Sequence, residues 1–174
     1  DDDSITLELM GGIIEPIGVT PLCFNSAEAF LSAYSPRPCE CVISDMRMPG
    51  VSGLQLHKVL QARYPVPPPL IIVTGYAEVS AAVEAMKQGA FDFVEKPIQG
   101  HQFLEKLQAA LALSRELHHQ RLQLATREAR IALNADDLPR AYELGVALGD
   151  HWTAGLAAWR LSRFNESFAA FERV

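Results

Sequence analysis

Residues 41–50 read CVISDMRMPG, and this stretch decides the fold of the chain. Cys41 to Ser44 is a short apolar run of strand-forming residues that stops at Asp45, and Pro49-Gly50 follows as a turn. The pattern predicts a buried strand with the Asp45 carboxylate just past its carboxyl end.

The same arrangement recurs on both sides of this stretch. Leu70 to Val73 is a second apolar run and ends at Thr74-Gly75, and residues 91–95 form a third that ends at Lys96-Pro97. Gly18 to Phe24 predicts a further short strand upstream. These runs are too apolar for an antiparallel sheet with one wet face, so they favour a parallel sheet covered on both sides.

Helical segments alternate with these strands. We expect helices over 4–15, 26–34, 53–63 and 78–88, the last one ended by Gly89, and a long helix from His101 onward. Strands that alternate with helices of about ten residues are typical of a doubly wound α/β fold with a parallel sheet.

Polar side chains follow the predicted strands where each strand ends. Asp45, Thr74 and Lys96 should meet at one edge of the sheet, which is where open α/β sheets bind ligands. The acidic run Asp1-Asp2-Asp3 precedes the first helix and should lie at the same edge. Each group alone has an ordinary explanation, a frayed terminus for the acidic run or a turn residue for Asp45. The combination is what indicates a site.

This set of groups suits a carboxylate that accepts a phosphoryl group. Phosphoryl transfer depends on positioning and on electrostatic stabilisation of spread negative charge. Asp1, Asp2 and Asp45 supply oxygen ligands of the kind that Mg²⁺ prefers, Lys96 supplies a fixed cation and Thr74 supplies a hydroxyl.

Several separated motifs carry a family resemblance. Residues 1 to about 112 resemble a receiver domain of bacterial two-component response regulators, of the subfamily that includes the nitrogen-fixation regulators and usually precedes a LuxR-type helix-turn-helix. The motifs are Asp1-Asp2-Asp3, residues 25–31 (NSAEAFL), residues 44–50 (SDMRMPG) with Ser52-Gly53, residues 73–75 (VTG), residues 85–90 (AMKQGA) and residues 92–97 (DFVEKP). The resemblance implies a flavodoxin-like doubly wound parallel sheet whose first strand is truncated.

The resemblance also implies a role for each site residue. Asp45 is the expected phospho-acceptor. Lys96 is expected to contact the phosphoryl oxygens, and its peptide bond to Pro97 is expected to be cis. Thr74 is expected to swing toward the phosphate. Phe93 is the expected switch aromatic, with a plain core role as its alternative. The expected Mg²⁺ ligands are Asp2, Asp45 and the backbone carbonyl of Arg47, with Asp1 acting through water.

Three departures from the family pattern stand out. The first strand, expected before Asp1, is absent, which should leave an unpaired slot in the sheet and a chain that is unstable alone. Gly11-Gly12 is an unusual filling for the first helix. Tyr76 stands where a small residue or histidine is common, which should alter the lifetime of the phosphoryl group in a direction that the sequence does not give.

The remainder of the chain is helical. We expect a receiver domain over 1–112, a helical linker over 113–134, either a coiled coil or an ordinary exposed helix, and a small α-helical hairpin over 135–174. The hairpin starts at Ala135-Asp136-Asp137, breaks at Gly149-Asp150 and alternates small with large aromatic residues over 154–173. This last unit is weakly similar to a tetratricopeptide-like repeat.

Composition excludes several classes of protein. Hydrophobic residues make up 49% of the 174 residues and the formal net charge is −6, which argues against a disordered chain and against a strongly basic nucleic-acid surface. Cys23, Cys39 and Cys41 lack the spacing of a zinc site and are expected to be reduced thiols. We expect a cytoplasmic protein with no membrane association. Both ends look cut, as in a fragment of a longer chain.

The sequence thus predicts a phosphorylation switch with Mg²⁺ as cofactor, fed by a sensor histidine kinase, and not a dedicated enzyme. Its output face would be helix 78–88, strand 91–95 and the helix from 101, which would form a phosphorylation-dependent homodimer and control transcription through DNA contacts outside this chain. An alternative is a protein-interaction regulator that acts through its helical-repeat tail. A pseudo-receiver, a fused gene fragment and an anion-binding flavodoxin-like domain remain further alternatives.

Overall fold

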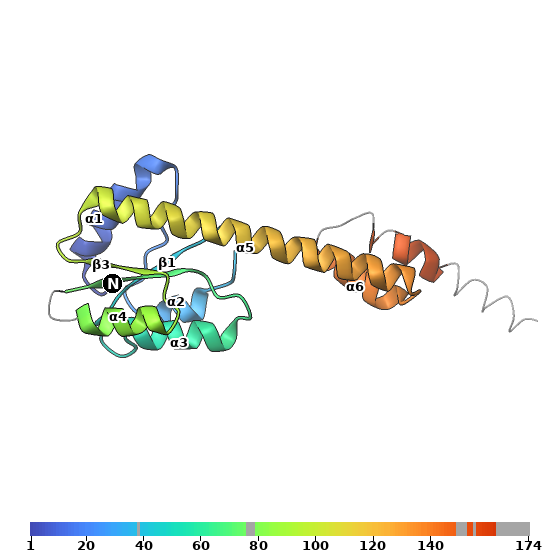
Figure 1. The fold of residues 1–174 in the computed structure, drawn as a ribbon, viewed down its shortest axis with the longest axis horizontal. Helices are drawn as coiled ribbons and strands as arrows, with labels where there is room; N and C mark the ends of the chain where they lie inside the picture. Colours follow the sequence, from blue (N-terminus) through green and yellow to red (C-terminus); the bar gives the residue numbers. More distant parts are fainter. Residues whose placement is uncertain (38, 76–78, 149–152, 155, 163–174) are drawn as a thin grey trace, which may run out of the picture. The chain divides into compact units, whose positions relative to one another are not determined.

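The computed structural model describes residues 1–37, 39–75, 79–148, 153, 154 and 156–162 (Figure 1). The chain divides into two compact units, Asp1–Leu117 and His118–Val174. Tyr76, the expected break at Gly149-Asp150 and the end of the expected helix over 154–173 lie outside the described residues.

A parallel sheet forms the centre of the first unit. Its described strands are β1 (Val42–Asp45), β2 (Leu70–Thr74) and β3 (Asp92–Glu95), in the order β1-β2-β3. The register pairs Asp45 with Val73 and Thr74 with Glu95, so the three strands end at the same level. The predicted α/β class with a parallel sheet is therefore confirmed.

Helices cover both faces of this sheet (Figure 1). Alternate residues of β2 point to opposite faces. Leu70 and Ile72 pack in a cluster with α2 (Ala27–Ala33), α3 (Gly53–Arg63) and α4 (Val79–Lys87). Ile71 and Val73 pack in a second cluster with α1 (Ser4–Ile14) and the first part of α5 (Gly100–Asn134). All five residues of β2 are buried, which is what the continuous apolar run predicted.

Side-chain caps fix where these helices begin and end. The Ser52 hydroxyl caps α3 by accepting a hydrogen bond from the Gln55 amide. The Gln55 side-chain oxygen accepts from the Ser52 amide in turn, which completes a capping box. Ser26 caps α2 by accepting from the Ala29 amide at 3.1 Å. Gly89 follows α4 with φ +96°, a left-handed conformation that glycine adopts without strain and that confirms its predicted role as a helix stop.

The prediction of a strand over Gly18–Phe24 is wrong. After α1 the chain passes through a short 3-10 helix, Glu15–Ile17, and residues 18–24 then run without regular structure. None of the described strands pairs with this segment, and an extended segment becomes a strand only when another strand pairs with it.

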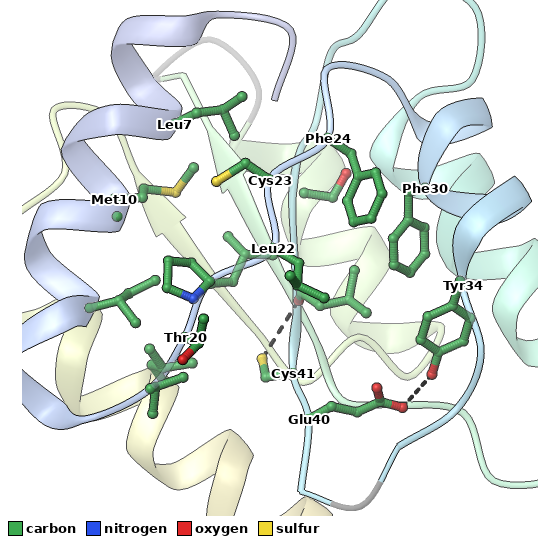
Figure 2. A pocket seen from close by; sticks show the side chains of 18 of the residues that line it. Leu7, Met10, Thr20, Leu22, Cys23, Phe24, Phe30, Tyr34, Glu40 and Cys41 are labelled. Atoms are coloured by element: carbon green, nitrogen blue, oxygen red, sulfur yellow. Dashed lines mark hydrogen bonds between the residues drawn. The ribbon is translucent and has the colours of Figure 1, made fainter.

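An apolar cavity of about 520 Å³ lies between residues 18–24 and β1, and we call it the slot. Residues 18–24 and 41–44 form its walls. Its sides are closed by Leu7 and Met10 of α1, by Phe30 of α2 and by Tyr34, which directly follows α2 (Figure 2). The expectation that main-chain groups beside this cavity are unpaired stays a prediction.

The second unit contains the end of α5 and a hairpin that follows it. Helix α5 ends at Asn134, and Asp136 in the turn after it has φ +63°. Helix α6 (Leu138–Leu148) begins two residues later. Leu133, Leu138, Ala141 and Ala157 belong to its apolar core. A Cβ on Gly145 would lie 2.6 Å from the Ala154 nitrogen. The backbone of α6 at Gly145 is therefore in close contact with the backbone at Ala154, in the helical segment that follows.

Candidate functional site

Three predicted site residues stand side by side at the carboxyl edge of the sheet. Asp45 ends β1, Thr74 ends β2 and Lys96 directly follows β3. The strand register places them at one level, and Asp1, just before α1, joins them. The peptide bond between Lys96 and Pro97 is cis, as expected.

The Lys96 ammonium lies between two carboxylates. Its Nζ is 3.2 Å from Asp1 Oδ2 and makes an even closer ion pair with Asp45 Oδ2. The side chains of Asp1 and Asp45 are 1% and 9% exposed, whereas Lys96 remains 34% exposed. Two nearly buried carboxylates therefore share one cation that solvent still reaches.

The second oxygen of Asp45 is fixed by the following turn. Asp45 Oδ1 accepts a hydrogen bond from the Arg47 amide at 2.8 Å. The start of α3 closes over this turn, since a Cβ on Gly53 would lie 2.3 Å from the Asp45 carbonyl oxygen. The carboxylate is thus oriented from both sides before any ligand binds.

Thr74 is completely buried, and its hydroxyl donates to the Gly75 carbonyl at 3.2 Å. A threonine hydroxyl is both a donor and an acceptor, and its hydrogen can rotate to suit its partners. This places a rotatable donor at the strand end next to Asp45.

The acidic run divides into different roles. Asp1 is buried at the site, Asp2 is exposed, and Asp3 caps α1 by accepting from the Ile5 and Thr6 amides at 3.2 and 3.1 Å. The hydrogen bond from the Thr6 hydroxyl, with these amides, holds the pKa of the Asp3 carboxyl below its ordinary value. Asp3 therefore serves the helix rather than the site.

A magnesium ion is implied by the site's resemblance, and the donor set fits it. Asp1 and Asp45 offer two carboxylates from different elements with a third, Asp2, exposed beside them, and Mg²⁺ sites commonly use one or two carboxylates plus carbonyls, waters and phosphate. Over the described residues, no group of three or more His, Cys, Asp or Glu side chains is gathered closely enough to form a cage by itself.

Phe93 lies in β3 and is partly buried against the cluster that includes α4. Lys106 of α5 approaches it, with Nζ 5.0 Å from the ring centroid. Sequence reasoning had singled out Phe93 but not Lys106, because a lysine on a helix gives no signal of its own. Lys106 is ten residues after Lys96 and lies in the first turns of α5, which pass beside the edge strand β3.

Sequence reasoning also missed two local signals at the site. Ser52 and Gln55 match the spacing of a capping box, and this box sets the start of α3 at Gly53. Asp3 precedes the first helical residues, where a capping role is common. Both signals were present in the sequence as spacing between short polar residues and a helix start.

None of the helices that the structure describes is long and apolar enough to cross a membrane.

Comparison with known proteins gives one consistent family. The model of the response regulator receiver domain matches residues 1–108. The transcriptional regulatory protein FixJ of Azorhizobium caulinodans is 41% identical over 116 residues, which are 67% of this chain and 54% of that protein. The response regulator protein TodT of Pseudomonas putida is 37% identical over 114 residues, 66% of this chain and 50% of that protein. The chain thus spans about half the length of these curated relatives.

Solved structures agree with this result. The response regulator receiver domain protein from Clostridium thermocellum has 27% identity and a TM-score of 0.60, and the match covers 67% of this chain and 94% of that one. Full-length FixJ from B. japonicum has 26% identity and a TM-score of 0.62 over 93% of this chain and 84% of that one. With a family model that matches 108 residues and a site whose acids, hydroxyl and lysine occupy neighbouring strand ends, the chain belongs to the response regulator receiver domain family.

Proposed function

We propose that this chain is a phosphorylation switch of a two-component system and that Asp45 is its phospho-acceptor. The observation that carries the proposal is the Lys96 ammonium shared by Asp1 and Asp45. A carboxylate that is nearly buried, oriented through its second oxygen and paired with a fixed cation is arranged for attack on a phosphorus atom.

Transfer of the phosphoryl group forms one bond and breaks one bond. One Asp45 oxygen forms a bond to phosphorus, the bond between phosphorus and the donor's leaving group breaks, and the leaving group departs with the electron pair. Lys96 would contact the phosphoryl oxygens, and the Thr74 hydroxyl would donate to them. Hydrolysis of the acyl phosphate returns the carboxylate, so the chain acts on itself and is not a dedicated enzyme.

Mg²⁺ binding is part of the proposal, because receiver domains generally bind this ion at the phosphorylation site. Asp1, Asp2, Asp45 and the Arg47 carbonyl would hold it here. When bound, it supplies positive charge to the phosphoryl oxygens.

The partners follow from the relatives. FixJ is named a transcriptional regulatory protein, which supports control of transcription as the output. We assign the phosphoryl donor to a sensor histidine kinase, the output to a phosphorylation-dependent homodimer formed through α4, β3 and the start of α5, and the chain itself to the cytoplasm. DNA contacts would come from a region outside this chain.

A second candidate output is supported by the second unit. The backbone contact at Gly145 and the small residues in its core, Ala132, Ala141 and Ala157, resemble closely packed helix pairs in repeat proteins. In this alternative the phosphorylated chain would bind a protein partner through the hairpin.

Intact-mass measurement tests the central proposal. The chain is incubated with Mg²⁺ and acetyl phosphate beside an Asp45→Asn control. We expect the wild type to gain the mass of one phosphoryl group and the control to gain none. An unchanged mass in both proteins would refute the role of Asp45, and an equal gain in both would place the phosphoryl group on another residue.

A further inference from the structure

The outer edge of β3 is closed by two side chains rather than by a strand. β3 is the last strand in the order β1-β2-β3, so one of its edges faces away from the described sheet. At this edge the Phe93 amide donates to Asp92 Oδ1 at 2.7 Å, and the Phe93 carbonyl accepts from Lys106 Nζ. Both main-chain groups of Phe93 are thus satisfied by side chains.

The two side chains also bind each other. Lys106 Nζ lies 2.7 Å from Asp92 Oδ1, the same oxygen that accepts from the Phe93 amide. The pair is partly shielded, with Lys106 21% and Asp92 29% exposed, so solvent screens it less than a surface ion pair. The result is a closed ring of contacts through Lys106, Asp92 and the Phe93 backbone.

The same ammonium also holds the Phe93 ring. It lies 5.0 Å from the ring centroid, within the range of a cation–π contact. One charge on α5 therefore fixes the backbone of Phe93, its ring and the neighbouring Asp92. Any movement of the ring out of its present position must break the cation–π contact, and a movement of the strand must also break the ion pair.

We infer that Lys106, with Asp92, is a positioning residue that clamps Phe93 and so sets how readily the switch responds to phosphorylation. The inference rests on the proposed role of Phe93 as the switch aromatic. Lys106 touches none of the groups that contact phosphate, so it acts only through Phe93. The clamp holds one position of the ring, and its loss should raise the population of the competing position.

The test follows the ring and the chemistry separately. The full chain carries fluorine-labelled phenylalanine, and the Phe93 resonance is assigned with Phe93→Leu. Lys106→Met removes the charge and keeps the length of the side chain, whereas Lys106→Arg keeps a cation and should retain the wild-type signal. Lys87→Met is the matched control, because Lys87 is 71% exposed and pairs with Glu84 on its own helix, α4.

We expect Lys106→Met to shift or broaden the Phe93 resonance and to speed acetyl phosphate labelling of Asp45 by about two- to fivefold, the size of one cation–π contact. Lys106→Arg and Lys87→Met should resemble the wild type. Asp92→Asn, which removes the ion pair but keeps an acceptor for the amide, should give an intermediate effect and serves if Lys106→Met does not fold.

The outcomes separate the two claims. An unchanged Phe93 resonance in Lys106→Met overturns the clamp, whether or not Asp45 is labelled. A changed resonance with a labelling rate equal to that of Lys87→Met overturns the link between clamp and switch. If no variant, wild type included, accepts a phosphoryl group, the proposed function fails, while the resonance still decides whether Lys106 holds the ring.

Discussion

At the start of α3, Gly53 brings a helix against the backbone of the residue that the site depends on. The space for a Cβ there is already taken by the Asp45 carbonyl oxygen at 2.3 Å and by Ser44 Oγ at 3.1 Å. Since Arg47 fixes the Asp45 carboxylate from the same turn, the position of Gly53 and the direction of the carboxylate are linked. The orientation of the Asp45 carboxylate thus depends in part on the absence of a side chain at Gly53.

Gly53→Ala should therefore disturb the site without removing any functional group. The added methyl must push the Asp45 backbone or the helix start, which we expect to cost about 1–3 kcal/mol in the free energy of unfolding. It should also slow acetyl phosphate labelling of Asp45. Urea unfolding and intact-mass kinetics measure the two effects.

Gly12→Ala is the matched control for this substitution. Gly12 lies in the exposed face of α1, and a Cβ added there would have nothing within 4 Å, so alanine should stabilise that helix by about 0.5–1 kcal/mol. If Gly53→Ala is as stable and as rapidly labelled as the wild type, the close approach at Asp45 has no effect on the site.

Among the elements, those with a full local pattern could be predicted well from the sequence. The helix expected over 53–63 is Gly53–Arg63, and the strand expected over 70–73 extends by one residue to Thr74. In both cases the period of the apolar residues and the capping or turn residues agree. The convergence of Asp45, Thr74 and Lys96 could also be predicted, because it follows from parallel strands that end at one edge.

Elements that depend on a distant partner could not be predicted in the same way. Gly18–Phe24 has strand composition, but none of the described strands pairs with it. Asp3 looks like part of an acidic site until its amide partners are known. Lys106 is found only when α5 and β3 are placed side by side. These facts depend on tertiary contacts that no spacing along the chain records.

The contact between α6 and the segment that follows it depends on Gly145 in a comparable way. A Cβ at this position would lie 2.6 Å from the Ala154 nitrogen and 3.0 Å from its Cα, and backbone atoms do not move aside cheaply. Gly145→Ala should therefore loosen the hairpin, with a loss of about 1–3 kcal/mol. Amide hydrogen exchange within α6 should become faster.

Val146→Ala provides the comparison within the same helix, because Val146 is 57% exposed and its substitution should change stability by less than about 0.5 kcal/mol. Exchange in β2 should be unaffected by either variant. Equal exchange rates in α6 for Gly145→Ala and the wild type would show that the two segments do not need their close contact.

For the whole molecule, the feature with the widest consequences is the slot, the apolar cavity beside β1. The Val42 amide donates to the Pro69 carbonyl, just before β2, and the Met46 amide donates to the Val73 carbonyl of β2. Main-chain groups alternate in direction along a strand, so those of Ile43 point away from β2 and toward the slot. Burial in this apolar region raises the pKa of the Cys41 thiol to about 12. The expectation that the chain is unstable alone stays a prediction.

Filling the slot should stabilise the first unit. A free peptide of four strand-forming residues, Val-Ile-Ile-Val, bound in the slot would bury apolar surface between residues 18–24 and β1, and we expect the free energy of unfolding to rise with peptide concentration. The amide of Ile43 should exchange more slowly. Urea unfolding and hydrogen exchange give the two readings.

The matched control is the same peptide with proline as its second residue, because proline cannot donate to a strand pair. Equal stabilisation by both peptides would mean that added apolar mass, and not strand pairing, fills the slot. No gain from either would mean that the slot does not accept a strand at all.

The two edges of the sheet have different consequences for handling the purified protein. Lys106 and Asp92 cover the β3 side, whereas on the β1 side the outer edge of the described sheet faces an apolar cavity. Open edges of this kind recruit strands from neighbouring molecules. Losses to precipitate should therefore grow with concentration and originate at the β1 side. A short apolar peptide in the storage buffer would act as a stabilising additive, and charged substitutions near β3 would do little for solubility.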